Sequence, residues 1–167
     1  MAITKTFGVG EIALTNTTGT WTYVTSSNVQ SFNHTDADDT SIVNIPIPFS
    51  NFGPGWQDEL KAITVTYTVV TAALDAAPTA VLNRNSWVAA TGVKTRAAVT
   101  QTLAFSGVDT VGTAAGAGAA GTHTAIVTIA DGDLLNRTTL RDYLLELTFN
   151  AAATTVLKIT GISIDFA

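Results

Sequence analysis

The sequence predicts an all-β protein: an antiparallel β-sandwich with the topology of a single jelly roll, built from about eight strands joined by turns and short helical connectors. Three observations lead to this prediction. Apolar residues recur at every second position in many runs, and clusters of Gly, Asn, Asp and Pro separate these runs. The composition includes 30 Thr among 167 residues and only 13% charged residues. Period-two alternation and β-branched residues are typical of half-buried strands.

The first strands in chain order are expected at residues 11–15, 21–25 and 41–47. Pro46 lies within the third of these, and Pro48 follows it. Proline has no N–H to donate to a β-ladder. The segment 41–47 is therefore predicted to be an edge strand or to leave the sheet at the prolines.

The clearest alternation lies at residues 63–69, where Ile63, Val65, Tyr67 and Val69 share one face and Thr residues occupy the other. A further strand is expected at 79–90, and weaker alternation predicts strands at 99–105 and 125–129. Residues 143–149 repeat the clear pattern. Short helical connectors are expected at 56–60 and 133–141.

The last strand, residues 155–166, contains a change of phase. Leu157 and Ile159 share one parity, whereas Ile162, Ile164 and Phe166 share the other, and Gly161 lies at the change. A β-bulge inserts one extra residue into a strand and often contains glycine. The sequence therefore predicts a long, bent strand with a bulge at Gly161.

The length fits a single domain over residues 1–167. Residues 1–10 are expected to form a flexible arm. Residues 112–121, GTAAGAGAAG, are expected to be a flexible loop or, in an assembly, a segment that packs closely against a neighbour. Its glycines make it a candidate assembly loop: Gly112, Gly116, Gly118 and Gly121. The last three spell G-x-G-x-x-G, but a strand follows them where a nucleotide site needs a helix.

The candidate metal ligands are Asp36, Asp38 and Asp39, close to His34. Carboxylates at alternate loop positions can converge on a divalent cation such as calcium. A solvated acidic turn explains the same residues without any ligand, and both interpretations stay open. No other cofactor is expected.

Catalytic motifs are not found in the sequence. The chain has no cysteine, and its two histidines, His34 and His123, lie near no nucleophile elbow or metalloprotease motif. We therefore expect no enzyme. The net charge of −5 argues against direct nucleic-acid binding. The sequence contains no signal peptide and no apolar run of about 18 residues that would cross a bilayer.

Aromatic residues suggest an alternative role. Trp21 and Tyr23 share one side of an expected strand, and Trp87 lies on another, so these rings could form a stacking face for a glycan. The other interpretation places the same rings in the sandwich core.

Residues 125–166, AIVTIADGDLLNRTTLRDYLLELTFNAAATTVLKITGISIDF, resemble the carboxyl-terminal strand, connector and hairpin of small all-β structural proteins from bacteriophages and related viruses. This group includes single jelly-roll capsid and capsid-decorating proteins. The resemblance implies a virion component that is assembled in the host cytoplasm. It also implies that the partners are copies of the chain itself and other virion proteins, and it transfers no catalytic residues.

The low charge favours the same function, because charged residues are depleted where subunits meet. The expectation is a non-enzymatic capsid or capsid-decorating subunit that forms a homo-oligomer. Two alternatives remain: a carbohydrate-binding or adhesion module with the same sandwich, and a subunit of a cellular surface layer or filament.

Overall fold

The computed structural model describes residues 3–18, 20–27, 29–34, 40–47, 59–71, 74–88, 90–107, 118–130, 141–151 and 156–166. These residues contain no α-helix. Their strands are β1 Ile3–Phe7, β2 Thr15–Thr18, β3 Trp21–Ser26, β4 Val29–His34, β5 Thr40–Pro46, β6 Leu60–Thr71, β7 Leu74–Val88, β8 Val93–Ala98, β9 Gln101–Gly107, β10 Gly121–Ile129, β11 Arg141–Ala151 and β12 Val156–Phe166.

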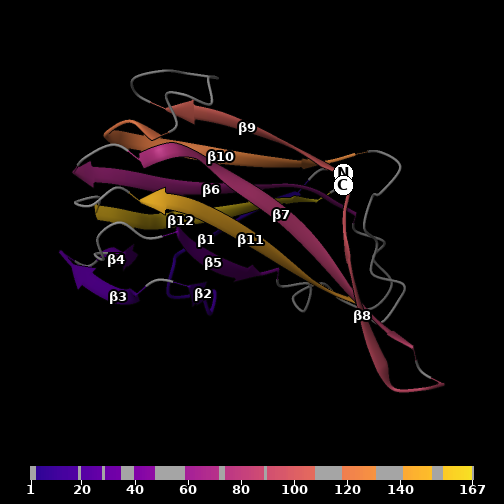
Figure 1. Ribbon diagram of the computed structural model, residues 1–167. Coiled ribbons are helices and arrows are strands. Elements are labelled where there is room, and N and C mark those ends of the chain that lie inside the picture. Colours follow the sequence, from indigo (N-terminus) through magenta and orange to yellow (C-terminus); the bar gives the residue numbers. More distant parts are fainter. Residues whose placement is uncertain are drawn as a thin grey trace.

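The strands form two sheets that face each other (Figure 1). The larger sheet has the order β3-β4-β12-β6-β10-β9, with β1 also paired to β12, and the smaller sheet has the order β2-β5-β11-β7-β8. Every recorded pairing is antiparallel. The predicted all-β, antiparallel two-sheet architecture is therefore confirmed.

The core lies between the sheets and is formed by the alternating residues that the sequence predicted. The inward residues of the central strands β6, β11 and β12 are buried, while the Thr residues of β6 at positions 64, 66 and 68 are partly exposed. The buried set on these three strands is Ile63, Val65, Tyr67, Val69, Tyr143, Leu145, Leu147, Phe149, Leu157, Ile159, Ile162, Ile164 and Phe166.

Aromatic rings connect the two sheets across this core. Trp21 stacks on Phe32 within the larger sheet, with 5.2 Å between ring centroids. Phe149 of the smaller sheet lies 5.8 Å from Trp21 and meets Tyr67 edge-on at 5.3 Å. Edge-on and tilted ring pairs add to the stability that burial of their area provides.

The predicted bulge in the last strand is confirmed. Ile159 pairs with Tyr67 and Gly161 with Thr66, so Thr160 is the extra residue of β12. The other edge of β12 changes its partner at the same place: residues 157–159 pair with β4, and residues 162–166 pair with β1. The bulge therefore lies at a fork between β1 and β4.

Two expectations about the first third of the chain need correction. Residues 1–10 are not an arm over their described part, because β1 pairs with β12 and Val9 is fully buried. The segment 41–47 is not an edge strand, because β5 lies between β2 and β11, but β5 ends at Pro46, as the other alternative predicted. β2 pairs with β5 only at residues 42–44, so β11 is the one described neighbour at Pro46, where a missing N–H is tolerated.

The helical connectors expected at 56–60 and 133–141 fall mostly outside the described residues. Of the described residues in these ranges, Leu60 and Arg141 belong to strands.

The side chain of Gln101 forms hydrogen bonds with β7 where the chain passes from the smaller sheet to the larger one. After β8, the Val99 amide donates to the Leu82 carbonyl at 2.8 Å, and the chain then enters β9. Gln101 accepts from the Leu82 amide at 2.9 Å through Oε1 and donates to the Ala80 carbonyl at 2.5 Å through Nε2. The side-chain amide of Gln101 thus continues the hydrogen-bond ladder of β7 beyond the point where its pairing with β8 ends.

Candidate functional site

The predicted metal ligands lie outside the described residues. Asp36, Asp38 and Asp39 fall in the undescribed segment 35–39. Among the residues that are described, no group of three or more His, Asp or Glu side chains could hold a metal ion. Their neighbour His34 is fully buried, with its ring 5.2 Å from that of Trp21.

The predicted aromatic face does not form as a platform. Trp21 is only 7% exposed and stacks on Phe32 inside the core, so no face of its ring is open to a glycan. Tyr23 is 48% exposed, and its hydroxyl donates to the Leu14 carbonyl at 3.1 Å. Trp87 is in β7, but its side chain is outside the described part. For Trp21, the core interpretation is the correct one.

The Gly/Ala-rich segment is described only at its end. Gly112 and Gly116 lie outside the described residues. Gly118 is buried against β7 of its own chain, where an added Cβ would lie 3.3 Å from the Leu74 Cβ. Gly121 begins β10 with a φ of 140°, a value that favours glycine. The close packing at Gly118 is within one chain, and the expected contact of this segment with a neighbouring subunit stays a prediction.

The histidines offer no catalytic arrangement in the described part of the chain. His123 is 1% exposed, its Nε2 lies 2.8 Å from the Ala119 carbonyl oxygen, and its ring packs near that of Tyr67. Burial also raises the pKa of Tyr67, because the phenolate would lose its hydration.

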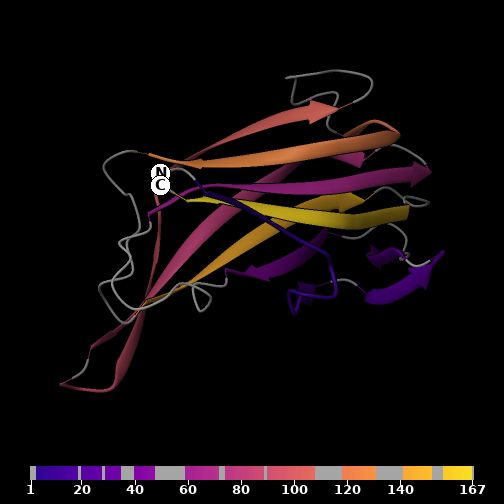
Figure 2. The ribbon, with the colours of Figure 1, turned by 180° about the vertical axis from the view of Figure 1, so that it is seen from behind.

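The most exposed element is the hairpin of β7 and β8, which extends beyond the body of the sandwich (Figures 1 and 2). We call residues 83–98 the arm. Every residue of β8 is exposed, as are Ala90, Thr91 and Gly92 in the turn. β11 pairs with β7 only as far as Ser86, so the end of the arm has no described strand beside it except its own partner. Gly92 has a φ of 65°, which a hairpin turn requires.

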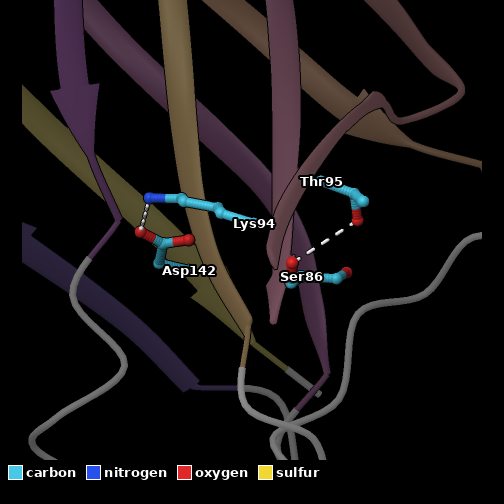
Figure 3. A network of polar contacts seen from close by, with 4 residues as sticks. All are labelled: Ser86, Lys94, Thr95 and Asp142. Carbon is cyan, nitrogen blue, oxygen red and sulfur yellow. Dashed lines mark hydrogen bonds and ion pairs between the residues drawn. The ribbon is translucent and has the colours of Figure 1, made fainter. Parts of the chain in front are cut away.

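Polar contacts join the two strands of the arm to each other and to β11. The Lys94 ammonium lies 3.0 Å from the Asp142 carboxylate, and the Thr95 hydroxyl donates to the Ser86 carbonyl at 3.4 Å (Figure 3). Arg96 forms an ion pair with Glu146. The Glu146 carboxylate also accepts a hydrogen bond from the side-chain amide Nδ2 of Asn83 at 3.0 Å. The side chains of Lys94 and Asp142 are 42% and 56% exposed, so water screens this pair and it can exchange partners readily.

A surface depression of about 520 Å³ lies at the fork between β1 and β4. Three separate segments form its wall: the turn after β1, the tip of the β3–β4 hairpin, and the bulge of β12. Its lining residues are Gly8, Val9, Gly10, Glu11, Thr25, Val29, Gln30 and Thr160. Among them Glu11 is the one charged residue, and Val29 is 57% exposed at the hairpin tip.

Backbone geometry fixes the shape of the depression. The Glu11 carboxylate accepts from the Gly8 amide at 2.6 Å, and the Glu11 amide donates to the Gly8 carbonyl at 2.9 Å, which closes the turn. A Cβ on Gly10 would overlap the side-chain amide of Gln30. The glycine therefore allows the turn to approach the β3–β4 hairpin closely.

Neither the arm nor the depression was predicted. The expected strand 79–90 stops before the turn at Gly92, although the alternation of Val93, Thr95 and Ala97 with two cations is a strand signal. The depression gives no sequence signal, because its residues come from positions near 10, 30 and 160.

No protein-family model matches the chain, and no curated protein resembles it at a significant level. In the described part of the chain, no helix has the length and hydropathy that a membrane crossing requires.

Proposed function

We propose that this protein is a non-enzymatic structural subunit of a virion shell, either a capsid or a capsid-decorating protein, that works through contacts between subunits. The observation that carries this proposal is the arm, whose β8 strand and described turn residues are exposed and whose end extends past the last pairing of β7 with β11. An isolated two-stranded hairpin is only marginally stable in water. Contact with the surface of another subunit would therefore stabilise the end of the arm.

The order of the strands supports a jelly roll. Eight strands carry this order; in chain order, with β9 left out, they are β4, β5, β6, β7, β8, β10, β11 and β12. Of these, β4, β6, β10 and β12 belong to the larger sheet, and β5, β7, β8 and β11 belong to the smaller one. Numbered from one to eight, they are ordered 1-8-3-6 in one sheet and 2-7-4-5 in the other. This is the arrangement of two interleaved Greek keys, which is found in viral capsid domains and also in lectins. The fold alone does not choose between these functions.

The glycan-binding alternative loses its main support, because Trp21 is buried. Of the two candidate rings whose side chains are described, Tyr23 is the half-exposed one, and its hydroxyl donates to the backbone of residues 12–14. A cellular filament or surface-layer subunit would use the same kind of contacts as a virion protein, and the geometry of the assembly distinguishes the two.

Native mass measurement of the purified chain tests the proposal. We expect oligomers or particles of many copies, with closed shells favouring the virion assignment and open filaments or flat lattices favouring the cellular one. A monodisperse monomer at high concentration would contradict the proposal. If that monomer bound glycans on an array and Tyr23→Ala abolished the binding, the adhesion alternative would replace it.

A further inference from the structure

We infer that the arm of one copy docks into the depression of a second copy, so that subunits associate head to tail. This inference rests on the proposed function and names the contact through which the subunits assemble. Its support comes from the positions, shapes and charges of the two surfaces.

The arm and the depression lie far apart on the molecule. The arm extends from one end of the sandwich, and the β3–β4 hairpin, which forms part of the depression, lies at the opposite end in both views (Figures 1 and 2). An arm therefore cannot reach the depression of its own chain without refolding. Two different surfaces of a subunit that bind each other give a heterologous contact, which produces rings or open filaments.

The shapes of the two surfaces are compatible. The described residues of the turn, Ala90, Thr91 and Gly92, have small side chains and are fully accessible. The wall of the depression contains Gly8, which is exposed and has no Cβ, so a backbone can approach it closely. Val93 beside the turn is 53% exposed, and Val29 at the rim is 57% exposed. Contact between these valines would remove apolar surface of both from water.

The charges are complementary. The arm contains Arg84, Lys94 and Arg96 and no acidic residue. The whole chain has 8 basic and 13 acidic residues, so five basic and thirteen acidic residues, a net charge of −8, remain for the rest. Glu11 supplies the negative charge of the depression. Lys94 is the arm cation nearest the turn, and its exposed pair with Asp142 is weak enough to be exchanged for Glu11.

A charge-reversal experiment tests this contact. Glu11→Lys and Lys94→Glu should each raise the dissociation constant of self-association at least about tenfold, because like charges then face each other. Sedimentation velocity measures this constant. An equimolar mixture of the two variants should recover association, since each arm then finds a depression of opposite charge. Both variants have a negative net charge, so general attraction cannot explain a recovery.

Asp75→Lys and Lys61→Glu are matched controls, because both residues are exposed, lie in neither the arm nor the depression lining, and give the same changes of net charge. These controls, alone and mixed, should associate like the wild type. Thermal unfolding checks that all four variants fold. Two results would overturn the inference and leave the proposed function standing, provided that the wild type self-associates. Either the charge-reversal variants associate as well as the controls, or mixing the two charge-reversal variants restores no association. A wild-type chain that stays monomeric would overturn both.

Discussion

At the scale of single residues, the ionisation of Tyr67 makes the free energy of unfolding depend on pH. Its side chain is fully buried between Phe149 and His123, and burial raises the pKa of its phenol above the ordinary value of about 10. The unfolded chain therefore loses this proton at a lower pH than the folded chain. The stabilisation is fully present below about pH 10 and is lost as the pH rises above that value.

We expect the free energy of unfolding of the wild type to fall faster above about pH 10 than that of Tyr67→Phe, by up to about 1.4 kcal/mol per pH unit. Urea titrations at a series of pH values measure both slopes. Tyr23 and Tyr143 are present in both proteins, so the difference between the slopes reports on Tyr67. Equal slopes of unfolding free energy against pH in the two proteins would show that the core does not raise the pKa of the Tyr67 phenol.

Gly161 illustrates how far a single residue can be understood from sequence. The phase change of the apolar residues correctly located the bulge, because only an extra residue can keep both halves of β12 facing the core. The glycine itself is not what the bulge requires. Its φ is outside the positive range, and an added Cβ would meet nothing within 4 Å. The hydrophobic pattern, and not the special residue, carried the information.

At the scale of elements, strands with alternation could be predicted even where the alternation is weak, as in β9 and β10, whereas β1 and β8 were not predicted. β6, β11 and β12 bury one face against the opposite sheet, so their sequences show the period of two. β8 has no buried face, and β1 lies at the edge opened by the bulge. The partner of β1 is β12, which is distant in sequence, so a local pattern cannot reveal this pairing, whereas β8 pairs with β7, the strand before it in the chain.

The chain crossing at Gln101 gives a prediction for an element boundary. Gln101→Glu keeps the acceptor for the Leu82 amide but replaces the donor to the Ala80 carbonyl with a carboxylate oxygen. We expect a loss of about 1–3 kcal/mol at neutral pH, because a partly buried carbonyl loses its partner and faces a negative charge. Chemical denaturation measures this loss. Thr102→Ala, an exposed neighbour, should change stability by less than about 0.5 kcal/mol, and equal effects would contradict the role of Gln101.

At the scale of the whole molecule, the distribution of charge is more informative than its total. The low charged share favoured covered surfaces, but only the fold places Lys94 and Arg96 on one exposed strand that has no acidic residue. In the proposed contact, the cations of one arm approach acidic residues of a second copy, and we expect salt to weaken this attraction. The two ends of each subunit then differ, so association has a direction.

Direction gives the last prediction. A flexible Gly/Ser segment inserted between Thr91 and Gly92 should leave the fold intact, because both residues are exposed and loop closure changes stability by about 1 kcal/mol or less. The blocked arm cannot dock, but the depression of the same copy still accepts a wild-type arm. A small fraction of this variant should therefore terminate growing assemblies and shorten them, as measured by light scattering. The same segment appended after Ala167 is the control. In a symmetric contact made by two arms, the variant would be left out and the assemblies would keep their size.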